Sequence, residues 1–501
     1  MTSPTHQQLP VAGLDDLSNE TRTIATPWIR MLRGIGLGQY PIDYDAAIAD
    51  HLRDTFTRLT AKVPGDAYTT FSEHLTDFVL RTVDPHAEER GGYTETLVLV
   101  GAVRAIPNPY YRALAASILM DAFAKLRLGS LLVSGHLDFP AEALDMLDQI
   151  SPDGIADENQ GRHGEYERVS ASTAVFLAVG QLGLRSRLVT PGRNRILEAL
   201  DLLERIPTPY FCGRAGGTLL SVIALLDYTE YIFDGDRDYM AEVLEYLTRA
   251  DEIGNWPEFH NHITTPWKKV YPLLTMLNAV AMCGRAEYLY RPIDALAEVT
   301  ALMDQIPWEI RVHMEQYAVI ALHNLGRLGD QVPDLDALLA DMVAVFDQID
   351  PGENYSPRGN AFPYVIEVAM MTGRMHLVPD TALERMADSF PDLIRTEHDV
   401  ANRAFPVSYV VNILGEIGRP EYAFGPRARY EGASAVEWFV DNLSDGGVVE
   451  GDRITMFDHA LISSALRLRG AHAPETALYQ SFRFPFNDRN PAREVEPALA
   501  D

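Results

Sequence analysis

The chain has 501 residues, 47% of them hydrophobic, and a formal net charge of −29. This length supports a large core, and the negative charge makes nucleic acid and anionic membranes poor partners for the general surface. Cys212 and Cys283 are the only cysteines, which excludes a disulfide framework and an all-cysteine metal site.

In chain order, residues 1 to 28 are expected to form a flexible tail, because this segment is polar and lacks a basic-then-apolar signal pattern. We predict one domain over residues 29–470, with a helical N-terminal extension to about residue 130, and a C-terminal extension over 471–501. The longest apolar runs fall short of the roughly 20 residues that cross a bilayer. We therefore expect a cytoplasmic protein without a transmembrane segment.

A helical repeat runs through the domain. Amphipathic segments end in similar motifs, such as LDMLDQI, LDLLERI and TALMDQI, and their last residues recur every 43 to 56 positions. These last residues are Ile150, Ile206, Ile253, Ile306, Ile349, Ile394 and Leu443. After each comes a polar loop and then a second segment that is apolar on nearly all sides, most often closed by Gly or Gly-Arg. The pattern predicts helical hairpins whose second helix stops at that glycine.

A helix that is apolar all round must be buried, whereas a helix with one apolar stripe can cover it. We therefore predict an all-α fold in which hairpins of about 45–50 residues close into an α/α toroid, with the second helices inside. An open α-solenoid, whose repeats have a similar length, is the alternative.

Each loop inside a hairpin ends in a basic residue, and these residues recur every 43 to 54 positions. They are Arg168, Arg214, Lys268 with Lys269, Arg311, Arg358, Arg403 and Arg453. A cation at a helix N-terminus opposes the helix dipole by about 0.3–1 kcal/mol, so a shared rim of cations favours an anionic ligand such as a diphosphate. The alternative is that each cation pairs with a nearby loop carboxylate, such as Glu165, Glu167, Glu309 or Asp452.

Aromatic residues follow the basic ones and are expected to line a cavity below the rim, although aromatic residues at helical spacing also fill ordinary cores. The candidates for substrate contact are Trp267, Tyr271, Tyr317, Tyr364, Phe405 and Tyr409. The candidate acids and bases are Glu258, Asp399, Asp458 and His459. Two histidines and a carboxylate could also bind a metal, but no spacing is diagnostic, so we predict no metal site and no cofactor beyond Mg²⁺ with a diphosphate substrate.

The hairpin pattern resembles the α/α toroids, which include class II terpenoid cyclases, protein prenyltransferase β-subunits, lanthionine cyclases and α,α-barrel carbohydrate enzymes. The resemblance is one of architecture. The segment from Asp234 to Asp238, Asp-Gly-Asp-Arg-Asp, differs from the cyclase motif Asp-x-Asp-Asp, and the two isolated cysteines do not match a zinc site. No catalytic residue is carried over from these families.

Three functions follow as hypotheses. The first is an isoprenoid-type, terpene cyclase-like enzyme (a lyase or isomerase) that binds a diphosphate at the basic rim and folds the hydrocarbon in the aromatic cavity. The second is a carbohydrate-active hydrolase, lyase or epimerase that acts on an anionic sugar. The third is a non-enzymatic helical-repeat protein that binds an acidic peptide.

Overall fold

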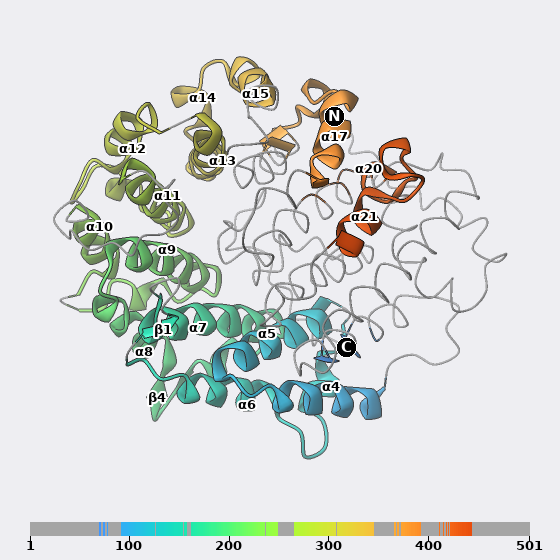
Figure 1. Cartoon of the computed structure of the whole chain (residues 1–501). Helices are drawn as coiled ribbons and strands as arrows, with labels where there is room; N and C mark the ends of the chain where they lie inside the picture. The colour runs from blue at the N-terminus through green and yellow to red at the C-terminus, as the bar shows by residue number, and fades with distance from the viewer. Residues whose placement is uncertain are drawn as a thin grey trace, which may run out of the picture. The chain divides into compact units, whose positions relative to one another are not determined.

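The computed structural model describes residues 92–125, 127–153, 155–157, 162–235, 237–248, 265–306, 308–344, 372–391 and 421–442, with single residues between 70 and 78 and between 365 and 419. Nearly all regular structure in these ranges is helical, so the prediction of an all-α fold is confirmed (Figure 1). The described strands form two short antiparallel pairs, β1 (Ile155–Asp157) with β2 (Arg162–His163) and β3 (Val189–Thr190) with β4 (Arg193–Asn194). No described helix combines the length and apolar character that crossing a membrane requires.

The chain divides into two compact units. Unit 1 contains residues up to 105 together with 339–473, and unit 2 contains 106–338 together with 474–501. The predicted tail over residues 1–28 and the predicted extension over 471–501 lie outside the described residues.

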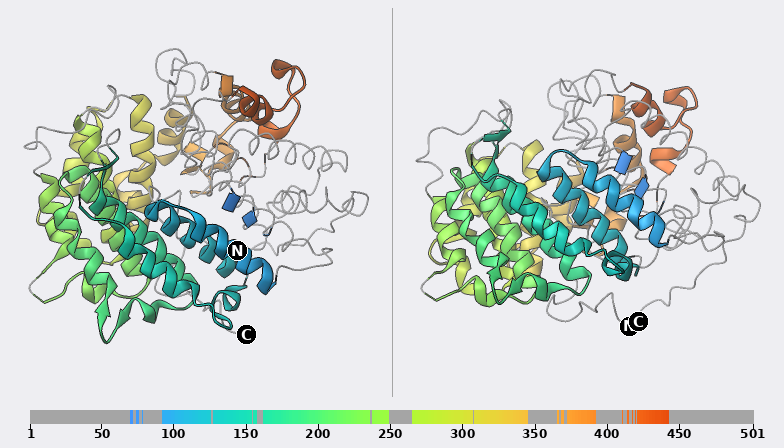
Figure 2. Two further views of the ribbon diagram at one scale, coloured as in Figure 1. Left: turned by 60° about the horizontal axis from the view of Figure 1, so that its bottom comes forward. Right: turned by 90° about the horizontal axis from the view of Figure 1, so that it is seen from below.

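Unit 2 is built as an inner and an outer layer of helices. Its inner helices are α5 (Pro109–Lys125), α7 (Gly164–Gln181), α9 (Pro209–Leu225), α11 (Thr265–Met282) and α13 (Trp308–Asn324). The outer ones are α6 (Phe139–Met146), α8 (Arg195–Asp201), α10 (Tyr239–Thr248) and α12 (Ala295–Met303), with the short α14 (Leu328–Gln331) after α13. Figure 1 shows the inner helices following one another with the outer ones outside them, and Figure 2 shows the same packing from two other directions.

The inner helices are the segments that are apolar on nearly all sides, and burial agrees with that pattern. Most residues of α7 and α9 are buried and the rest are half-buried, whereas α10 buries one face and exposes the other. The isoleucines that end the outer segments, Ile150, Ile206 and Ile306, are at most 4% exposed. The equivalent residues Ile253, Ile349, Ile394 and Leu443 lie outside the described residues.

The inner helices end in one common way, as the closing glycines predicted. The second residue after each helix has a positive φ of 59–73°: it is Gly183, Gly284 and Gly326 after α7, α11 and α13, and the non-glycine residues Arg127 and Asp227 after α5 and α9. The next N–H then donates to a carbonyl five residues earlier, for example Leu184 to Val179 at 3.0 Å and Arg285 to Val280 at 3.1 Å. This bonding pattern satisfies carbonyls that a helix end would leave open, and glycine adopts the left-handed conformation without steric cost.

Short 3₁₀ turns follow the helices of unit 2. They are η2 (Gly129–Val133), η3 (Leu147–Gln149), η4 (Arg185–Arg187), η5 (Leu203–Arg205), η6 (Thr229–Tyr231) and η8 (Ala286–Leu289). Outer helices begin at a side-chain cap: Asp138, Asn194, Asp238 and Asp294 each accept a hydrogen bond from an N–H of the first turn. The Asp-rich segment before α10 therefore caps a helix.

Unit 1 contains the described helices α4 (Tyr93–Ala105), α17 (Asp380–Asp388), α20 (Glu421–Phe424) and α21 (Ala435–Asn442), with η10 (Met375–Leu377) and η11 (Ala428–Tyr430). Helix α15 (Leu335–Ala344) crosses the boundary between the units. Arg427 binds Asp388 at the end of α17 at 2.7 Å. Ser434 and Glu437 cap α21 reciprocally, each side chain accepting from the backbone N–H of the other.

Candidate functional site

Four successive inner helices of unit 2 each contribute one tyrosine to a common cluster. Tyr166 comes from the first turn of α7, Tyr210 from the first turn of α9, Tyr271 from α11 and Tyr317 from α13. All four are at most 6% exposed. Together with Arg214 of α9 they form what we call the arginine–tyrosine cluster.

The aromatic rings of this cluster touch one another in series, with Phe211 as a link. The ring centroids of Tyr166 and Phe211 are 4.7 Å apart, those of Phe211 and Tyr210 are 5.2 Å apart, and those of Tyr210 and Tyr271 are 6.1 Å apart. Tyr271 and Tyr317 meet edge to face at 5.1 Å. Such contacts fix ring orientations and add about 0.5–1.5 kcal/mol per pair beyond area burial.

The guanidinium of Arg214 lies against these rings. Its Cζ is 5.5 Å from the ring centroid of Tyr271 and 5.9 Å from that of Tyr210, within the range of a cation–π interaction. Its Nη1 donates to the Tyr210 hydroxyl at 3.4 Å, and the hydroxyls of Tyr271 and Tyr317 are 3.4 Å apart. Nε of Arg214 is shielded from solvent, while the residue as a whole keeps part of its surface exposed.

Electrostatics keep this cluster in one protonation state at neutral pH. Burial acts to lower the pKa of the Arg214 guanidinium, but Coulombic interactions with the four tyrosines outweigh it, so that the pKa lies above its ordinary value. Burial raises the pKa of the Tyr210 phenol, which the charge of Arg214 offsets only in part. A permanent cation therefore stands beside a protonated phenol, and both are hydrogen-bond donors.

Helix α9 reaches this position because glycines allow it to approach its neighbours closely. A Cβ at Gly217 would lie 2.6 Å from the carbonyl carbon of Thr275 in α11, and one at Gly213 would lie 2.7 Å from Pro272 Cβ. Thr275 Oγ1 also donates to the Gly213 carbonyl at 3.1 Å across the same interface. The glycine-rich segment CGRAGG is thus a packing surface within α9.

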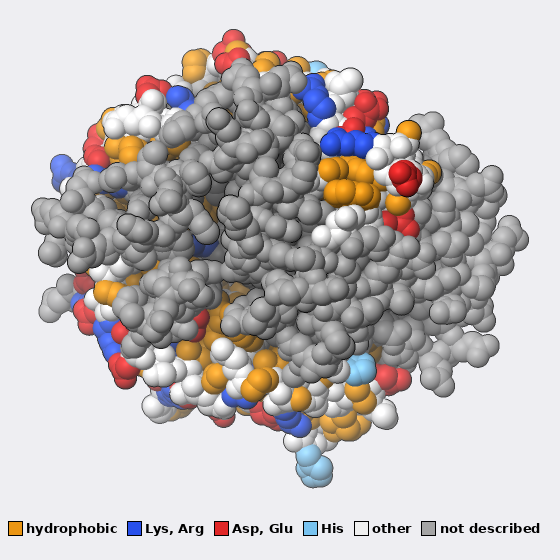
Figure 3. All heavy atoms as spheres, in the orientation of Figure 1, with side chains coloured by type: hydrophobic (Ala, Val, Ile, Leu, Met, Phe, Trp, Pro, Cys, Tyr) orange, Lys and Arg blue, Asp and Glu red, His pale blue; other side chains and the backbone are white. Residues whose placement is uncertain are grey.

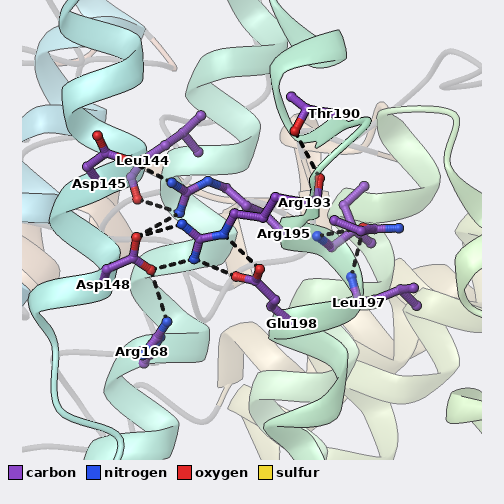
Figure 4. A network of polar contacts seen from close by, with 11 residues as sticks. Leu144, Asp145, Asp148, Arg168, Thr190, Arg193, Arg195, Leu197 and Glu198 are labelled. Carbon is purple, nitrogen blue, oxygen red and sulfur yellow. Dashed lines mark hydrogen bonds and ion pairs between the residues drawn. The ribbon is translucent and has the colours of Figure 1, made fainter.

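Arg168 of α7 lies in a different kind of environment, which we call the Asp148 network (Figure 4). The Asp148 carboxylate accepts from Arg168 at 3.1 Å, from Arg193 at 2.6 and 2.7 Å and from Arg195 at 3.5 Å. Arg193 also binds Glu198 at 2.7 Å. The hydrogen bond from Arg193 is the largest cause that lowers the pKa of Asp148. Arg168 therefore pairs with a carboxylate of η3, whereas the alternative drawn from the sequence named adjacent loop carboxylates such as Glu165 and Glu167.

Two further rim cations of unit 2 also have carboxylate partners. Nζ of Lys269 lies 2.6 Å from Glu298 of α12. Arg311 binds Asp304 and Glu315, both at 2.8 Å. On the described part of the face drawn in Figure 3, acidic and basic side chains are likewise intermixed. In each of these pairs the cation lies on an inner helix. The acid lies either close to it in the sequence or on an outer helix.

The expectation that the basic residues stand at loop ends is wrong for those in the described ranges. Arg168, Arg214, Lys269 and Arg311 all lie within the first or second turn of their helices. For α9 the reason is local, because Pro209 is a favoured first helical residue and the helix starts there. The helix-dipole cost falls off within the first turn, so it is weaker than the sequence argument assumed.

Several predicted site residues lie outside the described residues: Glu258, Asp399, Asp458, His459, Arg358, Arg403, Arg453, Tyr364, Phe405 and Tyr409. The side chains of Trp267 and Lys268 in α11 also lie outside the description. The structure therefore brings together Arg214, Tyr271 and Tyr317 from the predicted set and keeps Arg168 apart from them in the Asp148 network. In the described ranges, no three His, Cys, Asp or Glu side chains form a group that could hold a metal.

Sequence reasoning missed Tyr166 and Tyr210. It looked for aromatic residues after each basic residue, whereas these two precede Arg168 and Arg214 by two and four positions. A spacing of four places two side chains on the same face of a helix, so Tyr210 four residues before Arg214 was a usable signal.

Comparisons of the chain with protein-family models, with curated proteins and with solved structures find no match. The function must therefore be inferred from the residues and the chemistry of the site.

Proposed function

We propose that this chain is an enzyme for a small organic anion and that the arginine–tyrosine cluster binds the anionic group of its substrate. The observation that carries the proposal is the position of Arg214, a charged side chain held against aromatic rings that four helices supply. A partly buried guanidinium interacts more strongly with an anionic group than one in bulk water, because the local dielectric constant is lower. The part of Arg214 that stays exposed supports access by a ligand.

The finer proposal concerns the body of the substrate. The rings of Tyr166, Phe211 and Tyr210 contact one another in series beside the guanidinium and offer apolar faces next to a cation. This combination suits an amphiphile with an anionic head and supports the isoprenoid-type, terpene cyclase-like hypothesis. The phenol hydroxyls equally suit the oxygen-rich body of an acidic sugar, which keeps the carbohydrate-active hypothesis as the second candidate.

We also propose that the hairpins close into an α/α toroid. The burial of most residues of α7 and α9, with none of them fully exposed, supports closure, because an open solenoid needs a solvated concave face. Small-angle X-ray scattering on the full chain tests this. A compact particle of this length has a radius of gyration of about 23 Å, and a markedly larger value would favour the open form.

The experiment for the function is a thermal-shift titration of the wild-type chain, Arg214→Gln and Arg168→Gln with pyrophosphate, geranyl diphosphate and glucuronate. A ligand that binds only the folded state stabilises it by RT ln(1 + [L]/Kd), so Tm rises with the ligand concentration. We expect at least one ligand to raise the Tm of wild type and of Arg168→Gln, but not of Arg214→Gln.

Arg168→Gln is the matched control, since it removes an arginine at a similar position of the neighbouring helix. A ligand response that both variants retain, or no response to any of the anions, would argue against the proposed site.

A further inference from the structure

The outer helices of unit 2 share a second repeat, which is one of acidic positions. An acid stands four residues after the capping residue in α6, α8, α10 and α12, and these acids are Glu142, Glu198, Glu242 and Glu298. In α6, α8 and α10 another acid stands seven residues after the cap, and these are Asp145, Asp201 and Glu245. The acids therefore recur at equivalent places along the outer layer.

An arginine directly before the cap of α8 joins acids of two successive outer segments. Arg193 donates to Glu198 of its own helix and to Asp148 of η3, the turn that follows α6, at 2.6–2.7 Å (Figure 4). Arg195 adds a bond of 2.7 Å to Asp145 of α6. We call an arginine that stands before a cap and binds both its own helix and the preceding outer segment an arginine clamp.

A second arginine clamp joins α8 to α10 in the same way. Arg237 stands directly before the cap of α10 and donates to Glu242 of its own helix, to Asp201 of α8 and to Glu204 of η5, at 2.5–3.2 Å. The hydroxyl of Tyr239 also donates to Asp201 at 2.6 Å. The two clamps thus link α6, α8 and α10 in series.

The next junction, between α10 and α12, has the acids but not the arginine. Ile293 stands directly before the cap of α12, and Glu298 binds Lys269 of the inner helix α11 at 2.6 Å. The hydroxyl of Tyr288 in η8 donates to Asp238, the cap of α10. Among the residues that the structure describes, no ion pair joins α10 to α12. The series of clamps therefore stops at α10.

The clamps couple neighbouring helices because several charges act together. A single exposed ion pair contributes little to stability, but a planar guanidinium that binds two or three carboxylates forms a network. The side chains of Arg193 and Arg237 are only 36% and 35% exposed, so solvent screens them in part. When one clamped helix opens, the bonds to its neighbour are lost as well, and the openings of the two helices become coupled.

We propose that the two arginine clamps make α6, α8 and α10 one cooperative unit, the clamped block, and that α12 opens independently of it. Because α12 packs on α11, its opening uncovers an inner helix while the clamped block stays folded. The inference concerns motion of the outer layer and does not depend on the proposed function.

Hydrogen–deuterium exchange of the full chain at pH 7, followed by mass spectrometry, measures these openings, since amide protection reports the free energy of local opening. We expect the protection factors of α8 and α10 to agree within about threefold and that of α12 to be at least about tenfold lower. Protection of α12 equal to that of α10 in the wild-type chain would overturn the proposal.

Arg237→Gln removes the clamp between α8 and α10 and leaves its three carboxylates without their shared cation. Protection of both helices should fall about tenfold, while that of α12 should change less than about twofold. The control is Arg327→Gln, because Arg327 is exposed and binds one acid, Asp330, in its own short helix α14. It should change no helix of the clamped block by more than about twofold. A loss confined to α10, or an equal loss in α12, would contradict the cooperative unit.

Ile293→Arg supplies the missing arginine in the folded background of the wild-type chain. Glu298 and Glu245 stand where the acids of the two existing clamps stand, so protection of α12 should rise about threefold or more. Ile293→Gln is the matched control, since it removes the same half-buried apolar side chain without adding charge. No rise in Ile293→Arg, or the same change in both variants, would show that the arginine does not couple the outer helices.

Discussion

Arg168 and Arg214 occupy similar positions in the neighbouring inner helices α7 and α9, yet they have different environments. Arg168 lies in the Asp148 network, where a carboxylate that is about one-third exposed accepts from three arginines. Arg214 lies in the arginine–tyrosine cluster, where ring faces and phenol hydroxyls surround it. Local sequence accounts for part of the difference: four residues before Arg214 stands Tyr210, and four residues before Arg168 stands Gly164.

The comparison shows that a repeated basic residue does not imply a repeated role. In the Asp148 network, opposite charges neutralise each other and link the end of α6 to the start of α8, which suits a structural role. In the arginine–tyrosine cluster, the described contacts of the guanidinium are with tyrosine rings and a phenol hydroxyl. The two regions should therefore respond differently to substitution, pH and ligand.

The largest effect on stability is expected at the interface between α9 and α11. The arginine–tyrosine cluster depends on the close approach of these two helices. Gly217→Ala would place a Cβ 2.6 Å from the Thr275 carbonyl carbon, so the helix backbones must separate. We expect a loss of about 3 kcal/mol or more in the free energy of unfolding, measured by urea denaturation.

The control for that substitution is Gly192→Ala, in the turn between β3 and β4, where an added Cβ meets nothing within 4 Å. It should change the free energy of unfolding by less than about 0.5 kcal/mol. Equal stabilities of the two alanine variants would show that close contact of α9 with α11 is not required.

Asp148→Asn should have the next largest effect. It removes the one carboxylate that Arg168, Arg193 and Arg195 share and leaves their charges facing one another. We expect a loss of about 1–2 kcal/mol at pH 7, because the group is partly exposed and solvent screens it.

Asp153→Asn is the matched control, because the side chain of Asp153 is 80% exposed and its carboxylate binds only the exposed Arg205 in the described structure. It should cost less than about 0.5 kcal/mol. If Asp153→Asn lost as much stability as Asp148→Asn, the Asp148 network would contribute no more to stability than an ordinary surface ion pair.

The pH dependence of the Asp148 contribution follows from the sign of its pKa shift. The carboxylate has a lower pKa in the folded protein than its ordinary value of 3.8, chiefly because Arg193 donates to it. Its stabilisation is therefore complete above pH 3.8 and is lost as the pH falls through the lower folded value.

The difference in stability between wild type and Asp148→Asn should thus be constant from about pH 5 to 8 and shrink at more acidic pH. Denaturation curves at several pH values would measure it. A difference that grew on acidification would contradict the role assigned to the ionised carboxylate. The arginine–tyrosine cluster should show no such change, since the pKa values of Arg214 and Tyr210 both lie above their ordinary values.

The smallest effect on stability is expected for Tyr317→Phe. The variant keeps the ring contact with Tyr271 and removes only a hydroxyl at 3.4 Å from the neighbouring phenol. We expect a loss of about 0.5–1 kcal/mol in the free energy of unfolding. A loss above about 2 kcal/mol would show that the hydroxyl pair is a principal structural element of the cluster.

The repeat and its boundaries could be predicted well from sequence, because they depend on local rules. The outer helices lead into buried isoleucines such as Ile150 and Ile206, and glycines such as Gly183 and Gly284 end the inner helices with positive φ. Hydrophobic periodicity and helix-stop residues report such features directly. The starts of the inner helices were predicted less well, because the polar first turn of a buried helix resembles a loop.

The candidate site could be predicted only in part. The sequence singles out Arg214, Tyr271 and Tyr317. It assigns Arg214 to the same basic rim as Arg168, and it assigns the two tyrosines to an aromatic cavity lining. Their convergence depends on the rotation of each inner helix and on the close approach that Gly217 permits. The pairing of Asp148 with Arg193 joins residues 45 positions apart. Neither the convergence of these side chains nor the long-range ion pair can be predicted from the spacing of residues in the sequence.

The most direct test of the central claim is a crystal structure of the full chain with 4-iodobenzoate, whose iodine can be located by anomalous scattering. We expect the ligand carboxylate to lie at about 2.7–3.0 Å from the guanidinium nitrogens of Arg214. Binding of the ligand at Arg168, or a carboxylate of the chain itself filling the edge of Arg214 where the ligand should be, would contradict it.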